Sequence, residues 1–173
     1  TDAGLFERAL QAVILSQYRR KIFEKNKLLI KPIILIKSKT IAENKEFRLN
    51  FQKGIINLTA DDLRKVKQTT NDDTLKRTFA YFELNKIGLE NLVSEIKVDF
   101  GNEKLLIIDT NNDSVKKQLA LNTLESPTNE YRAIFAVDKL NEGWDVLNLF
   151  DIVRLDVKRD ARNNIPGLTT VRE

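Results

Sequence analysis

The feature that most constrains the fold is a pair of short apolar runs separated by a polar loop. Residues 133–137 (Ala-Ile-Phe-Ala-Val) and 150–155 (Phe-Asp-Ile-Val-Arg-Leu) have the length and the β-branched and aromatic content of strands. Such runs suit strands that are covered on both faces, as in a parallel sheet. The loop between them, residues 138–145, holds three acids, one Gly and the only Trp of the chain. Ligands of open α/β sheets bind at the carboxyl ends of strands, so we expect a ligand site at this loop.

The rest of the chain alternates further apolar runs with segments of helical periodicity. Residues 33–36 and 104–109 are two more predicted strands, and the end of the chain from 158 is polar. Helices are predicted over 2–27, 41–53, 61–68, 75–84, 89–96 and 114–124. This alternation favours an α/β fold with a parallel sheet, interrupted by a helical insertion over 55–100.

The turn after the first predicted strand is a candidate anion site. Its sequence is Lys37-Ser38-Lys39-Thr40, and Thr40 with Glu43 has capping-box spacing, so a helix should begin at Ile41 and end before Gly54. Free N–H groups, two lysines and a hydroxyl would converge there and could bind a phosphate. The alternative is a well-capped turn whose lysines are merely solvated.

Composition excludes several classes of chemistry. The 173 residues contain no Cys and no His, which removes thiol nucleophiles, zinc sites and His-based triads. We therefore predict no catalytic residue and no metal site in this chain. No run approaches the roughly 18 apolar residues that span a bilayer, so we expect no membrane association. The aromatics Phe79, Tyr81 and Phe82 of the helix predicted over 75–84 should pack in the core, because few basic residues are interleaved with them.

Positive charge is concentrated in the first third of the chain. Residues 1–53 hold 12 Lys and Arg against 5 Asp and Glu, whereas residues 54–173 hold 17 against 20. A basic segment is compatible with phosphate contacts, although a solvated helix face gives the same pattern. For the cluster 19–21 we favour a packing or connecting role of the first helix over nucleic-acid binding.

Two segments resemble conserved motifs of superfamily 2 helicases. Residues 136–146 (Ala-Val-Asp-Lys-Leu-Asn-Glu-Gly-Trp-Asp-Val) resemble motif V, and residues 31–40 (Lys-Pro-Ile-Ile-Leu-Ile-Lys-Ser-Lys-Thr) resemble motif IV. Both are similar to the Res subunit of type III restriction-modification enzymes, and the resemblance extends from about residue 28 onward. It implies the second RecA-like lobe of a helicase or translocase motor, of the P-loop NTPase type, over 28–173. The helix over 1–27 would then connect the lobes.

The resemblance also implies roles for individual residues. Gly143 would let the backbone approach ATP, Asp145 would position arginines of motif VI, and Glu142 would contact ATP or an inter-lobe arginine. Nucleic-acid contacts would come from two groups of residues: Ser38, Lys39 and Thr40 in motif IV, and Asp138, Lys139 and Asn141 in motif V. Val137 departs from the Thr that many of these helicases have, so that hydroxyl contact is not expected here.

Cofactors and partners follow from the same resemblance. The chain has no P-loop, no Asp-Glu box and no motif VI, and it contains no Met. We therefore expect a fragment that is inactive alone, with ATP and Mg²⁺ bound mainly by a first RecA-like lobe of the same polypeptide. The parent would be an ATP-dependent endonuclease of the bacterial cytoplasm, acting on double-stranded DNA with a methyltransferase (modification) subunit. Two alternatives remain: a free-standing α/β nucleotide- or protein-binding module, and the second lobe of another superfamily 2 helicase.

Overall fold

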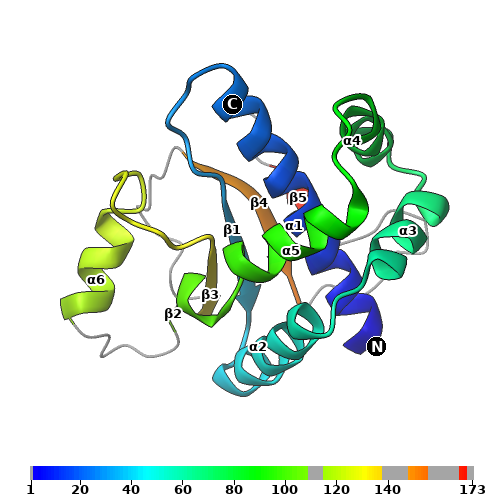
Figure 1. The fold of residues 1–173 in the computed structure, drawn as a ribbon. Coiled ribbons are helices and arrows are strands. Elements are labelled where there is room, and N and C mark those ends of the chain that lie inside the picture. The colour runs from blue at the N-terminus through cyan, green and yellow to red at the C-terminus, as the bar shows by residue number, and fades with distance from the viewer. Residues whose placement is uncertain (1, 109–114, 138–147, 156–167, 171–173) are drawn as a thin grey trace.

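The structure is a computed structural model that describes residues 2–108, 115–137, 148–155 and 168–170. Its elements in chain order, shown in Figure 1, are α1 (Asp2–Lys25), β1 (Ile33–Ser38), α2 (Ile41–Ile56), α3 (Ala60–Thr69), α4 (Asp73–Leu84), α5 (Leu89–Asp99), η1 (Asn102–Lys104), β2 (Leu105–Ile108), α6 (Val115–Asn122), β3 (Ala133–Val137), β4 (Leu149–Arg154) and β5 (Leu168–Thr170).

The strands form one sheet in the order β2-β3-β1-β4-β5. The first four are mutually parallel, and β5 pairs antiparallel with β4. The predicted α/β class with a parallel sheet is therefore confirmed, and the arrangement is consistent with a RecA-like lobe. Because β1, β3 and β4 run in one direction, the turns that follow them leave from the same edge of the sheet, called here the carboxyl edge. The opposite edge is the amino edge.

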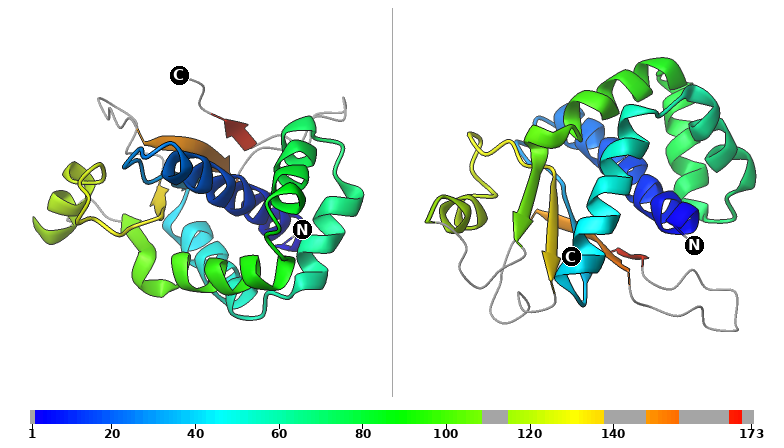
Figure 2. Two further views of the ribbon diagram at one scale, coloured as in Figure 1. Left: turned by 45° about the horizontal axis from the view of Figure 1, so that its top comes forward. Right: turned by 90° about the horizontal axis from the view of Figure 1, so that it is seen from below.

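Helices cover both faces of the sheet, which explains why β3 and the first four residues of β1 are apolar. On β1, Ile34 and Ile36 belong to the large core cluster under α1, α2 and the helical insertion. Ile33 and Leu35 belong to a second cluster, which contains Leu121 of α6. Figure 2 shows α6 on one side of the sheet and the other helices on the opposite side. Alternation of side chains along a strand thus sends neighbouring residues of β1 into two cores.

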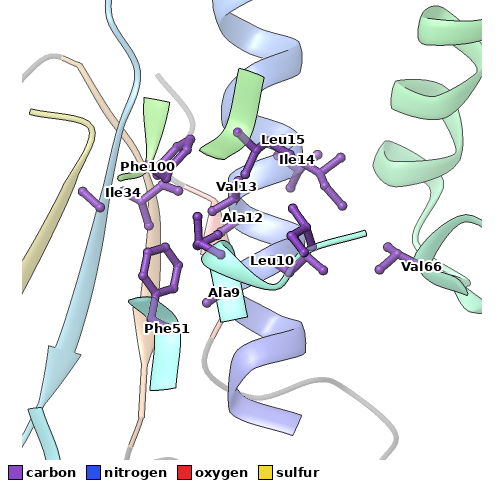
Figure 3. Packing of buried hydrophobic residues seen from close by; sticks show 14 of the residues in the cluster. Ala9, Leu10, Ala12, Val13, Ile14, Leu15, Ile34, Phe51, Val66 and Phe100 are labelled. Atoms are coloured by element: carbon purple, nitrogen blue, oxygen red, sulfur yellow. The ribbon is translucent and has the colours of Figure 1, made fainter. Parts of the chain in front are cut away.

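Helix α1 forms the centre of the larger core. Its residues 9–15 are all buried, and Figure 3 shows the apolar ones among them in one cluster with Ile34, Phe51 and Phe100. Three cations of its C-terminal half, Arg19, Arg20 and Lys21, form ion pairs with other elements of the fold. Arg19 bonds to buried Asp151 of β4, and Lys21 bonds to Glu95 at 2.8 Å. These pairs support the interpretation of α1 as a packing helix.

The helical insertion begins as its capping residues predict. Thr59 and Asp62 form a reciprocal capping box at the start of α3, and the Asp72 side chain caps α4. Phe79 and Phe82 are 2% and 1% exposed, which confirms that these aromatics of α4 pack in the core.

Three expectations from the sequence need correction. Helix α2 continues through Gly54 to Ile56, and Gly54 inside the helix allows a close contact: an added Cβ would lie 2.3 Å from the Phe6 ring. Strand β4 is only partly covered, since three of its six residues have intermediate exposure. Strand β5 was not expected in the polar end of the chain, and it exists by pairing with β4.

Candidate nucleic-acid interface

The carboxyl edge brings the two motif-bearing segments together. Ser38, the last residue of β1, pairs in register with Val137, the last residue of β3. The motif IV turn therefore begins beside the strand end from which the motif V segment continues. Most of that second segment lies outside the described residues, namely the predicted site residues Asp138, Lys139, Asn141, Glu142, Gly143 and Asp145.

The turn between β1 and α2 is held by its own hydroxyl groups. Ser38 is 1% exposed, and its hydroxyl donates to the Thr40 carbonyl at 3.1 Å. The Thr40 hydroxyl accepts from the backbone N–H of Glu43 at 3.1 Å and so caps α2. Ser38 and Thr40 thus shape the turn, whereas Lys39 between them is exposed.

The start of α2 offers backbone donors next to Lys39. The first N–H groups of any helix have no partner within the helix. Thr40 accepts from the N–H of Glu43, and the N–H groups of Ile41 and Ala42 belong to exposed residues of the same first turn. Together with the positive end of the helix dipole, they favour an anion at this place.

Asn44 connects this turn to the neighbouring strand, and sequence reasoning missed it. Its side chain is fully buried in the first turns of α2, and its Nδ2 donates to the Ala136 carbonyl of β3 at 3.3 Å. Its Oδ1 is buried with no hydrogen-bond partner among the described residues. The signal in the sequence is a polar residue that begins the stripe Asn44, Phe47, Phe51, Ile55 on the buried face of α2.

A further basic residue lies on the same edge. Arg154, the last residue of β4, is exposed and pairs in register with Lys37 of β1. The sequence placed it inside a predicted strand and gave it no role in binding. Exposed Arg154 and Lys39 flank the ends of adjacent strands, which gives this edge a positive rim suited to phosphates.

Metal centres, membrane spans and cavities are three other kinds of site that the described residues could form. They contain no group of three or more acidic, Cys or His side chains placed to hold a metal ion. Within the same part of the chain, no helix is long and apolar enough to cross a membrane. A cavity of about 290 Å³ does exist, but it lies at the amino edge and includes none of the predicted site residues.

Comparison with known proteins gives an informative match. The chain is 35% identical over 172 residues to a protein of Haemophilus influenzae described as the "probable type III restriction-modification enzyme HindVIP Res subunit". The match covers 88% of this chain and 34% of that protein, so the chain spans about a third of the length of its relative. No protein-family model matches, and no solved structure matches significantly. The match confirms the resemblance to Res subunits that the two motifs indicated.

Proposed function

We propose that this chain is part of the ATP-dependent DNA motor of a type III restriction enzyme, in the position of the second RecA-like lobe. The observation that carries the proposal is the similarity to the HindVIP Res subunit along 88% of the chain. The parallel sheet supports it, because the two motif-bearing segments leave from adjacent strand ends at one edge. A free-standing binding module has no comparable observation in its favour.

In this proposal the carboxyl edge follows one strand of double-stranded DNA. Lys39 and the first N–H groups of α2 would bind a backbone phosphate, while Ser38 and Thr40 hold the turn in shape. Arg154 would add a second positive contact on the adjacent strand end. Asp138, Lys139 and Asn141 would extend the nucleic-acid side of the site, as the resemblance implies.

The same edge would couple DNA contact to ATP hydrolysis. Glu142, Gly143 and Asp145 are the proposed coupling residues, with Asp145 orienting arginines supplied from outside this chain. ATP and Mg²⁺ would be bound mainly by the first RecA-like lobe of a Res-length polypeptide, and hydrolysis there would drive movement. We propose that this chain alone neither hydrolyses ATP nor cleaves DNA, and that the whole enzyme works in the bacterial cytoplasm with a methyltransferase subunit.

A salt titration of DNA binding tests the phosphate contact. We expect Lys39→Ala to weaken binding by a similar factor for unrelated duplex sequences, because phosphate contacts carry no base information. The slope of log K against log salt should fall by roughly one unit for the lost contact. The measurement is fluorescence anisotropy of labelled duplexes at several salt concentrations, with the 173-residue chain and again within a Res-length protein.

The control is Lys65→Ala on α3, which removes the same charge from an exposed position in the helical insertion. It should leave the salt slope unchanged. Lys39→Ala should leave the urea unfolding curve within about 0.5 kcal/mol of wild type, since Lys39 is exposed. Equal slopes and affinities for wild type and Lys39→Ala would mean that the turn is only a capped connection.

A further inference from the structure

The cavity at the amino edge lies apart from the proposed DNA and ATP contacts. It has a volume of about 290 Å³, near the lower limit of common ligand pockets. It is built where α1 ends and where β1, β2 and β3 begin. The end of α1 and the start of β1 lie at the top of Figure 1. The turn with Lys39 follows the other end of β1, beside α2 at the bottom of the same view. A ligand here would leave the carboxyl edge accessible.

Three of the four acids that line the cavity are paired with cations of the lining. Arg20 bonds to Glu24 at 3.1 Å and to Asp99 at 3.3 Å. Arg132, which is 1% exposed, also bonds to Asp99 at 3.3 Å. Lys104 bonds to Glu130 at 3.1 Å. The fourth acid, Glu125, also has an interaction within the molecule. These acids therefore already have partners.

Lys31 is the cation of the lining that is held by neutral groups. Its ammonium group donates to the backbone carbonyl of Asn129 and to Asn129 Oδ1, the latter at 2.8 Å. An ammonium group has three protons, so a further acceptor can be accommodated. Burial, and then the charges of Arg132, Arg20 and Lys104, lower the pKa of Lys31 to about 8, while Glu130 opposes them. A carboxylate beside Lys31 would relieve this repulsion.

The rim of the cavity next to Lys31 is apolar and exposed. Leu28, Leu29 and Ile30 are 47%, 90% and 37% exposed, and all three line the cavity. Three consecutive exposed apolar residues beside a polar pocket are typical of a protein contact. Leu29 is so exposed that a ligand confined to the cavity would leave most of its surface in water, whereas a peptide segment crossing the rim would cover it.

We propose that the amino edge docks a protein segment that places a carboxylate against Lys31 Nζ and apolar side chains over Leu28, Leu29 and Ile30. The charge of Lys31 selects the acid, and the rim selects its apolar neighbours. The occupant is an acidic and apolar peptide segment of a protein partner.

A pair of labelled pentapeptides tests the docking site. One has a single Glu between pairs of Leu, and the other has Gln in place of that Glu. With the 173-residue chain, fluorescence anisotropy should show the Glu peptide binding about tenfold more tightly or better, as expected for a charge-assisted hydrogen bond. Lys31→Gln should remove this difference, and Lys65→Gln, an exposed lysine elsewhere, should retain it.

A second variant separates the apolar contribution from folding. Leu29→Asn changes a side chain that is 90% exposed, so the fold should be unaffected. It should lower the affinity for both peptides by about threefold or more and leave the ratio of the two affinities unchanged. Leu84→Asn, at another exposed leucine (83%), should have no effect on either peptide.

Binding of the Glu peptide should weaken as the pH rises through about 8, where Lys31 loses its charge. The other charged groups facing it are Arg20, Glu24, Asp99, Lys104, Glu125, Glu130 and Arg132. Burial lowers the pKa of Arg132 to about 10, which is above the pH at which Lys31 loses its charge. The proposal is overturned by equal affinities for the two peptides, by no binding of the Glu peptide up to about 1 mM, or by hexanoate binding as tightly as the peptide. The last result would indicate a small-acid site.

Discussion

Replacing Asn44 with Asp tests how closely the start of α2 is joined to β3. The two side chains have the same shape, but Asp exchanges the Nδ2 donor for an oxygen. The donor now bonds to the Ala136 carbonyl at 3.3 Å, in a position with no solvent exposure. In the Asn44→Asp variant an ionised carboxylate would therefore be buried against a carbonyl oxygen, and only the protonated acid could restore the hydrogen bond.

The size of the effect follows from burial and charge. Desolvation raises the pKa of a buried carboxyl, and a rise of about 2 to 3 units is typical of a fully buried site. The N-terminal end of the helix dipole opposes this by up to about 1 kcal/mol. Lys37 shares its face of β1 with Ile33 and Leu35, opposite to α2, so it is not placed to neutralise the acid. At about 1.4 kcal/mol per pKa unit, we expect a net loss of about 2 to 4 kcal/mol at pH 7.

The loss of stability in Asn44→Asp should increase with pH. Because the folded-state pKa of the introduced carboxyl is raised, the variant should match wild type below about pH 4, the ordinary pKa of Asp. Its deficit should grow as the pH rises and become constant above the folded-state pKa. Urea unfolding followed by circular dichroism between about pH 4 and 8 measures this difference.

Two controls separate charge from packing. Asn44→Leu removes the hydrogen bond without adding a charge, so it should cost about 1 kcal/mol at every pH. Asn91→Asp makes the same exchange at an exposed position in the first turn of α5 and should change stability by less than about 0.5 kcal/mol. A deficit of Asn44→Asp that is small and independent of pH would show that this side chain is open to solvent, contrary to the structure.

Gly54→Ala should destabilise the fold by about 1 kcal/mol, because crowding of the Phe6 ring, at about 1 to 3 kcal/mol, exceeds the gain in helix propensity of about 1 kcal/mol. In a Phe6→Ala background the same change should become stabilising in urea unfolding, and an unchanged sign would contradict the proposed contact. In a Res-length protein, Asp145→Ala should reduce ATP turnover on the order of 100-fold, as misplacement of catalytic groups does, with little change in DNA affinity. Near-normal ATP turnover in a folded Asp145→Ala protein would remove its proposed coupling role.

Much of the fold could be predicted because its signals are local. The strands β1, β2 and β3 are short apolar runs whose residues suit burial on both faces, and β3 has the bounds predicted for it. Helix starts were marked by side chains that bond to nearby N–H groups, as with Thr59 and Asp62. Each of these signals depends on residues within one turn or one strand, so a single sequence displays it.

The failures come from contacts between distant residues. Gly54 has the usual sequence signature of a helix end. In the structure, however, the ring of Phe6 of α1 occupies the space that a side chain at position 54 would need, and no local pattern shows this contact. Strand β5 has three residues and too little apolar content to be distinguished from a turn, so its partner β4 defines it. Asp151 is similarly a buried acid within an apolar run. Arg19, 132 positions away in the chain, donates a hydrogen bond to its carboxylate and so balances the buried charge.

The two edges of the sheet differ in how visible they are from the sequence. The candidate site at the carboxyl edge could be proposed from the sequence because its residues stand in two continuous segments, the turn around Lys39 and the segment after Val137. The amino edge collects single residues from the end of α1, the end of α5, the start of β2 and the start of β3. In the sequence Lys31 is a lysine before a proline, and its neutral partner Asn129 lies 98 positions away. The environment of Lys31 arises because the residues that precede parallel strands all lie at one edge of the sheet. The proposed docking site there therefore depends on the order of the strands, which a local sequence pattern does not show.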